Sequence, residues 1–224
     1  MLPLAATPTP PACQDNATLA TYQALNGGCI IGDKLFSNFT YQDSATSGLA
    51  GINAADITVD TVGPGQGITN PDIGLRFNAA WVVTSNQFLD SVIGFTVTVL
   101  NGYNLQIEDA GVGTVDALGG TGISSVAEHG CAAPCDPTTG NPWDTYVFNT
   151  AGTQASQHAF FAPTGSVSVL KDISVVGGSN GFAHLSVVQD TFSQVPEPRA
   201  LALLLGLGLL GGGVFRKKFL KASA

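Results

Sequence analysis

The sequence predicts a mainly β protein, an antiparallel β-sandwich or jelly roll with one short N-terminal helix and a single C-terminal transmembrane helix. Three observations predict this fold: segments of alternating apolar and polar residues, turn residues between those segments, and an apolar run near the end of the chain. The chain has 224 residues, of which 28 are glycine and only 11% are charged. Because soluble domains typically have ~25% charged residues, this composition is typical of a turn-rich β protein with a neutral polar surface.

The predicted helix comes first along the chain. It spans Asn16–Leu25, with Asp15 or Asn16 as its cap and Asn26-Gly27 as its end. Leu19 and Tyr22 fall on one side of this helix, which is therefore the side expected to face the core.

Beyond this helix the sequence alternates with the period of two that is expected of strands. Lys171 interrupts the apolar face of one of these segments. Asn101-Gly102 predicts a type I′ hairpin between Thr96–Leu100 and Tyr103–Glu108, because this dipeptide readily adopts the positive φ angles that the turn requires. The predicted strands are Ile52–Val62, Leu75–Thr84, Ile93–Val99, Tyr103–Glu108, Val167–Val175 and Ala183–Phe192.

The four cysteines allow three disulfide connectivities. Proximity favours Cys13–Cys29, which would clip the helix to the domain, and Cys131–Cys135, which would close a short loop. The alternative is a zinc site in which His129 joins Cys131 and Cys135, but this set offers three ligands at most and lacks the two-pair spacing of a zinc ribbon.

Charge is divided unevenly along the chain. Residues 1–198 contain three basic and all sixteen acidic residues, a formal charge of −13, whereas the remaining residues contain five basic residues and no acid. Nucleic-acid binding needs a basic footprint, so the acidic body excludes a nucleic-acid partner. The acidity is typical of an extracellular domain that stays soluble.

The C-terminal part predicts a membrane anchor. Ala200–Phe215 contains no charged residue, and as a helix it would span about 24 Å, slightly less than a hydrocarbon core of ~30 Å. Flanking basic side chains can extend to both interfaces, and the positive-inside rule places their larger cluster in the cytoplasm. The alternative is a buried core helix with a basic end. The flanking basic residues are Arg199, Arg216, Lys217, Lys218 and Lys221.

The order of motifs at this end resembles a known signal. Val195-Pro196-Glu197-Pro198, the apolar run and the basic cluster together resemble the PEP-CTERM sorting signal over about residues 195–221. The body also resembles a group of PEP-CTERM proteins of unknown function in Cys29–Phe39, Asp90–Phe95 and Phe192–Val195. The resemblance implies recognition by an exosortase, cleavage near Pro196–Pro198, and release from or attachment to the surface of a bacterium that makes exopolysaccharide.

These observations divide the chain into three parts. Leu4-Ala5-Ala6 before a Pro-rich stretch resembles the end of a signal peptide, so we expect the start of the protein to lie upstream of Met1. The parts are a Pro-rich linker or signal-peptide remnant (1–12), an extracellular β-sandwich domain (13–194) and the sorting signal (195–224), itself divided into a linker (195–199), a transmembrane helix (200–215) and a basic cytoplasmic tail (216–224).

Motifs for catalysis are weak. Gly177–Gly181 matches G-x-S-x-G around Ser179, but a strand pattern follows it where a nucleophile elbow needs a helix. We therefore predict no catalytic, cofactor-binding or metal-binding residues. Trp143 lies in a predicted loop beside polar residues, and an exposed aromatic there is a candidate contact for a ligand such as a sugar.

The sequence therefore predicts an exported, non-catalytic protein with a structural or surface-display role in the cell envelope or biofilm matrix. Its body would lie outside the cytoplasm, first anchored in the membrane and then at the cell surface or in the matrix. The alternative is an extracellular carbohydrate-binding module that acts on exopolysaccharide, and an enzyme is the third hypothesis. The expected partners are an exosortase, the membrane and exopolysaccharide.

Overall fold

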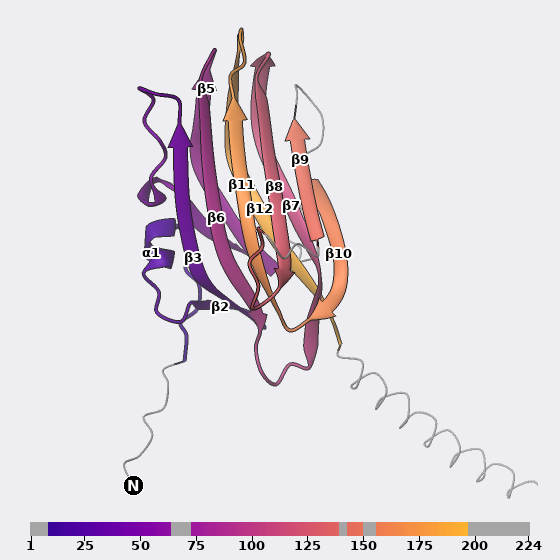
Figure 1. Cartoon of the computed structure of the whole chain (residues 1–224). Helices are drawn as coiled ribbons and strands as arrows, with labels where there is room; N and C mark the ends of the chain where they lie inside the picture. The colour runs from indigo at the N-terminus through magenta and orange to yellow at the C-terminus, as the bar shows by residue number, and fades with distance from the viewer. Residues whose placement is uncertain (1–8, 64–72, 139–142, 150–155, 197–224) are drawn as a thin grey trace, which may run out of the picture.

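The computed structural model describes residues 9–63, 73–138, 143–149 and 156–196. Figure 1 shows two antiparallel six-stranded sheets that pack face to face. In spatial order, the first sheet contains β1 (Ala17–Thr18), β4 (Thr58–Val62), β5 (Ile73–Thr84), β12 (Gly181–Pro196), β7 (Leu105–Gly120) and β10 (Ser156–Thr164). The second contains β2 (Cys29–Ile31), β3 (Lys34–Ala45), β6 (Phe88–Val99), β11 (Ser166–Val176), β8 (Ile123–Ala132) and β9 (Trp143–Asn149).

This architecture confirms the predicted antiparallel β-sandwich. Along β11, the side chains at every second position from Val167 to Val175 are buried, and those between them are more exposed. Successive side chains of a strand point to opposite faces of the sheet, so the buried set of each strand faces the other sheet. The core between the sheets is built mainly from valine, isoleucine, leucine and phenylalanine.

The N-terminal helix is shorter than predicted. α1 spans Leu19–Gln23, and a 3-10 turn, η1, spans Ala54–Asp56. Thr18 caps α1, because its Oγ1 accepts a hydrogen bond from the backbone N–H of Thr21 at 3.2 Å. The predicted cap at Asp15 or Asn16 is wrong, since Asp15 instead accepts two hydrogen bonds from Thr61. Leu19 and Tyr22 are buried, as predicted.

The predicted hairpin at Asn101-Gly102 is also wrong. Both residues form a turn, with Gly102 at a φ of 100°, but β6 and β7 belong to different sheets and do not pair. The turn therefore carries the chain from one layer to the other. The connection around Ser179 does the same between β11 and β12, and the residue is followed by a strand, as the sequence pattern indicated.

The last described strand extends into the predicted linker. Val195 and Pro196 pair with Gln106 and Leu105 of β7, so β12 includes the first two residues of the predicted linker. Within the described ranges, no helix is long and apolar enough to cross a membrane. The predicted transmembrane helix lies outside those ranges.

Candidate functional site

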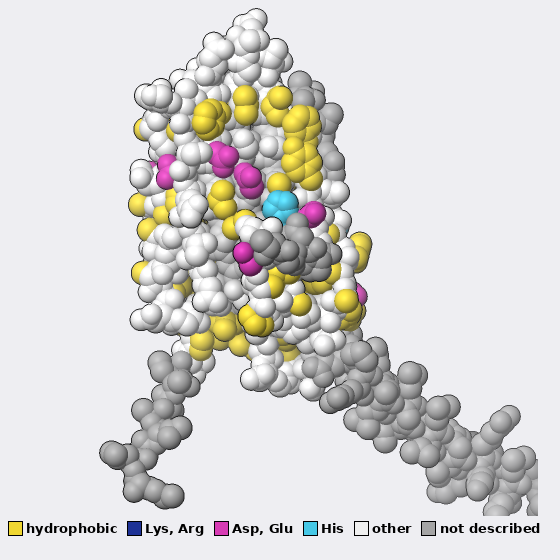
Figure 2. Space-filling model, viewed as in Figure 1, with side chains coloured by type: hydrophobic (Ala, Val, Ile, Leu, Met, Phe, Trp, Pro, Cys, Tyr) yellow, Lys and Arg dark blue, Asp and Glu magenta, His cyan; other side chains and the backbone are white. Residues whose placement is uncertain are grey.

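The outer face of the second sheet carries the clearest arrangement of exposed aromatic and acidic side chains. The strand register places its outward residues in rows, because directly paired residues point to the same side of a sheet. One row runs Tyr146, Ala127, Asp172 and Val92 from β9 to β6, and the next runs Phe148, Ser125, Ser174 and Asp90. In Figure 2, hydrophobic side chains gather over β9 and acidic ones lie over the middle strands.

Two aromatic residues form one end of these rows. Along β9 the buried positions alternate with exposed ones, so Tyr146 and Phe148 point outward. Their rings are 6.0 Å apart between centroids and inclined by only 15°, and the residues are 49% and 39% exposed. We call this pair the aromatic platform. Exposed, nearly parallel rings on one strand are suited to stacking against a flat apolar surface of a ligand.

Small side chains separate the platform from the middle of the sheet. These side chains are half-buried and project little from the sheet beside the rings. They belong to Ala127, Ser125 and Ser174. Asp172 lies two strands from Tyr146, a distance of about 10 Å at the usual strand spacing. A ligand that rests on the rings can therefore extend across the strands toward Asp172.

Three acidic residues on this face, two of them in the rows, supply hydrogen-bonding capacity. Asp144 Oδ1 lies 2.7 Å from Nδ1 of His129, and both side chains are partly exposed. On β6, burial raises the pKa of Asp90, and the charge of Asp172 and a hydrogen bond with it raise this pKa further. We call Asp90 and Asp172 the acid pair. Carboxylates accept hydrogen bonds from hydroxyl groups.

A polar groove continues the face beside the rows. The loop that follows β8 folds against β3, β6 and β11 and leaves a cavity of about 210 Å³, lined in part by Asn38, Thr96 and Asp136. Gly94 lies on the floor, where a Cβ would come within 2.4 Å of Thr40 Oγ1. The disulfide Cys131–Cys135 ties this loop to the end of β8.

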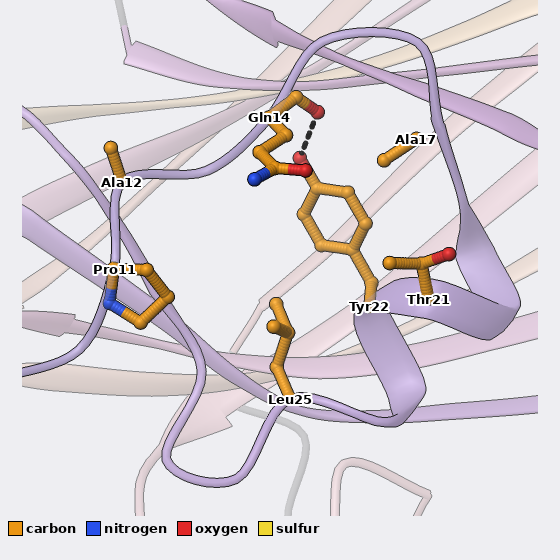
Figure 3. Close-up of a pocket in the computed structure, with 7 residues that line it drawn as sticks. All are labelled: Pro11, Ala12, Gln14, Ala17, Thr21, Tyr22 and Leu25. Atoms are coloured by element: carbon orange, nitrogen blue, oxygen red, sulfur yellow. Dashed lines mark hydrogen bonds between the residues drawn. The ribbon is translucent and has the colours of Figure 1, made fainter.

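A second cavity lies beside α1 and offers few polar side chains to a ligand. It has a volume of about 210 Å³ and is lined by Pro11, Ala12, Gln14, Ala17, Thr21, Tyr22 and Leu25 (Figure 3). Tyr22 donates a hydrogen bond from its hydroxyl to the carbonyl oxygen of Gln14 at 2.8 Å, and burial raises its pKa to about 12. Among the described residues that line this cavity, none is charged.

Trp143, the candidate ligand contact predicted from the sequence, lies inside the sandwich. It is 5% exposed, and its indole stacks on Phe161 with 5.1 Å between ring centroids. Gly130 makes room for the ring, since a Cβ there would lie 1.8 Å from it. The position of Trp143 therefore does not support a ligand contact. The exposed aromatics Tyr146 and Phe148 follow three and five residues later, and the alternation in 143–149 was the signal that could have identified them.

The remaining predicted residues divide into confirmed pairs and untested ones. Both predicted disulfides, Cys13–Cys29 and Cys131–Cys135, are present. The second of them uses both cysteines of the zinc alternative. Two disulfides are typical of an exported protein. Outside the described residues lie Glu197, Pro198, Arg199, Arg216, Lys217, Lys218 and Lys221.

Comparisons with known proteins found no matching family model and no matching curated protein. Among solved structures, TmCBM61 in complex with β-1,4-galactotriose is similar over 70% of this chain and 88% of its own, with 11% identity and a TM-score of 0.33. The enzymatically active domain of bacteriophage CBA120 tailspike protein 4 matches over 71% of this chain and 20% of its own, with 13% identity and a TM-score of 0.30.

A family 11 carbohydrate-binding module from Clostridium thermocellum, solved with a β-1,3-1,4-mixed-linked tetrasaccharide, matches over 66% of this chain and 87% of its own. Its identity is 9% and its TM-score 0.24. At TM-scores this low, these likenesses establish neither a shared fold family nor a shared function.

Proposed function

We propose that the protein is an exported, non-catalytic β-sandwich that binds a polysaccharide on the outer face of its second sheet. The observation that carries this proposal is the aromatic platform, in which Tyr146 and Phe148 lie parallel and exposed on one strand. The C–H faces of sugar rings are apolar surfaces that can pack on such rings, while sugar hydroxyls remain free for hydrogen bonds.

The rest of the face supports an extended ligand. Hydroxyl groups can donate to Asp144 beside the platform and to Asp172 two strands away, and the small residues between them leave space for sugar rings. The acidic side chains also disfavour a polyanion, because like charges repel. The proposed ligand is therefore a neutral or amino-sugar polysaccharide that crosses the strands.

The binding test compares the protein with Tyr146→Ala and Phe148→Ala on an array of neutral, amino-sugar and uronic-acid polysaccharides. Loss of one stacked ring is expected to lower affinity about tenfold, since an aromatic contact contributes roughly 1–1.5 kcal/mol. Tyr103→Ala is the matched control, because Tyr103 is 52% exposed but lies in the connection between β6 and β7. Binding that both platform variants retain in full would contradict the proposal.

We also infer that the C-terminal segment delivers this domain to the cell surface. One observation that supports this inference is the order of three features: the Val195–Pro198 motif, the uncharged run Ala200–Phe215 and the basic cluster. The two disulfides also support it, because they require an oxidising compartment. An exosortase is the proposed processing partner and the bilayer the proposed transient anchor. If no polysaccharide binds, the structural or display role predicted from the sequence is the remaining function.

A further inference from the structure

Three ionisable side chains meet inside the core, away from the proposed binding face. Lys171 comes from β11, Glu128 from β8 and Asp190 from β12, and all three are 0% exposed. Lys171 and Glu128 are directly paired across the second sheet, whereas Asp190 belongs to the first sheet. We call these residues the buried triad. It bridges the two layers of the sandwich.

The amine of Lys171 contacts both carboxyl groups of the triad. Lys171 Nζ hydrogen-bonds to Glu128 Oε2 and lies 3.1 Å from Asp190 Oδ2. Apolar residues surround it: Ile93 pairs with Lys171, and Leu75 and Val112 flank Asp190 on the neighbouring strands. The Asp190 oxygen that Nζ contacts is bonded to Cγ, the carbon that a deprotonated lysine amine would attack in acyl transfer, so the fold holds the two groups close together.

If the triad acts only as a set of paired ions, it is an energetically unfavourable way to fill this part of the core. Burying an ion costs several kcal/mol, and a buried ion pair is often no more stabilising than apolar residues of the same size. Among the described residues, Glu128 Oε1 and Asp190 Oδ1 have no hydrogen-bond partner, which adds a further penalty. A reaction that removes these charges would relieve the cost of burying ions.

Protonation in the triad suits such a reaction. Burial raises the pKa of Asp190 well above its usual range, and the charge of Glu128 raises it further. Burial lowers the pKa of Lys171, but the two carboxyl groups outweigh this effect and raise it. The reaction would therefore start from an ammonium at Lys171 and a neutral carboxylic acid at Asp190, with Glu128 Oε2 accepting a hydrogen bond from the ammonium.

We propose that Lys171 and Asp190 condense into an intramolecular isopeptide bond that joins the two sheets, with Glu128 as the group that transfers protons. Glu128 takes one proton from the ammonium, and the lone pair of the neutral amine attacks Asp190 Cγ. A second proton moves from the nitrogen to the departing oxygen. The N–Cγ bond forms, one Cγ–O bond breaks, one water molecule leaves, and Glu128 keeps one proton.

The product explains the position of the triad. The amide is neutral, so Lys171 no longer brings a positive charge into the core, and the amide N–H can donate a hydrogen bond to Glu128. The bond would also tie β12, the strand from which the C-terminal segment emerges, to β11 of the opposite sheet. It is independent of polysaccharide binding, because the triad faces the interior.

The test measures the intact mass of the folded, purified chain after reduction. The protein is expected to be lighter than its sequence mass by one water molecule, whereas Glu128→Gln, which keeps the shape of the side chain but not its basicity, should have the full mass. Lys34→Ala is the matched control and should keep the loss, because Lys34 is also 0% exposed but lies 3.0 Å from the adjacent Asp33.

A peptide map locates the bond without any variant. In the denatured, reduced protein, trypsin should fail to cleave after Lys171, since its amine is acylated, and residues 77–199 should remain one fragment in which Lys171 and Asp190 are cross-linked. Full mass together with cleavage after Lys171 would overturn the proposal. A water loss that fragmentation assigns to other residues would overturn it as well.

Discussion

At the scale of single residues, the acid pair makes stability depend on pH. The pKa of Asp90 is raised in the folded protein, first by burial and then by Asp172. The folded state therefore holds a proton that the unfolded chain releases, and stability falls as the pH rises from the ordinary aspartate pKa of ~3.9 through the raised value. Above that range, repulsion between Asp90 and Asp172 destabilises the fold.

We expect Asp90→Asn to raise the free energy of unfolding by about 0.5 kcal/mol at neutral pH, the size typical of partly exposed charge pairs. The gain should disappear in acid below the ordinary aspartate pKa, where the Asp90 carboxyl group is protonated in the folded and in the unfolded state. Urea titrations at neutral pH and at a pH below the ordinary aspartate pKa measure the free energy of unfolding of both proteins under each condition. An equal gain at both pH values would show that charge is not the cause.

Asp15 supplies a control of opposite sign. Hydrogen bonds from the backbone N–H and the hydroxyl of Thr61 lower the pKa of Asp15, so its contribution to stability is present above the ordinary aspartate pKa and is lost as the pH falls through the lowered value. Asp15→Asn should therefore destabilise the protein at neutral pH and have little effect in acid, the reverse of Asp90→Asn.

At the scale of elements, the sequence predicted strands but not their partners. Alternation identified β11 and β12 because each presents one apolar face to the core. The hairpin at Asn101-Gly102 was wrong because its turn signal is local, whereas the sheet to which β6 and β7 belong depends on pairing with β11 and β12 far along the chain.

The candidate site was predicted less well than the strands. On β9 the inward side chains include Thr145 and Asn149, while Tyr146 and Phe148 point outward, which reverses the usual relation between apolarity and burial. The one aromatic chosen from the sequence, Trp143, proved to be the inward one. Lys171 was correctly noted as an interruption of an apolar face, but its partners Glu128 and Asp190 are 43 and 19 positions away, and no spacing rule connects them.

The disulfides yield a prediction about elements. Cys13–Cys29 spans 16 positions and holds the N-terminal segment and α1 against β2, while Cys131–Cys135 spans four. In the chain-entropy model, the longer loop gives a stabilisation of about 3 kcal/mol and the shorter one about 2 kcal/mol. Replacing Cys13 and Cys29 with serine should therefore lower the free energy of unfolding more than replacing the other pair, as measured by urea titration without reductant. The reverse order would contradict this model.

At the scale of the whole molecule, the acidic body and the basic C-terminal segment have separate roles in the proposal. Residues 1–198 carry a formal charge of −13 and include the folded sandwich, and the five basic residues that follow flank or trail the uncharged run. Since β12 pairs with β7 as far as Pro196, a chain that ends at this residue keeps every described strand. The proposed anchor can therefore be removed without cutting the sandwich.

We expect the chain truncated after Pro196 to leave the membrane fraction of the producing cell and enter the soluble exported fraction, with the same thermal unfolding midpoint as the full chain. The physical reason is the hydrophobic effect: burying the side chains of the uncharged run in the bilayer would lower the free energy by more than the acidic surface of the body raises it. Immunoblots of the two fractions measure the shift.

Glu197→Ala combined with Pro198→Ala is the matched variant, because it keeps the uncharged run and the basic cluster while removing the proposed recognition motif. It should stay in the membrane at the unprocessed mass, and an identical distribution of all three chains would mean that this segment neither anchors nor sorts the protein.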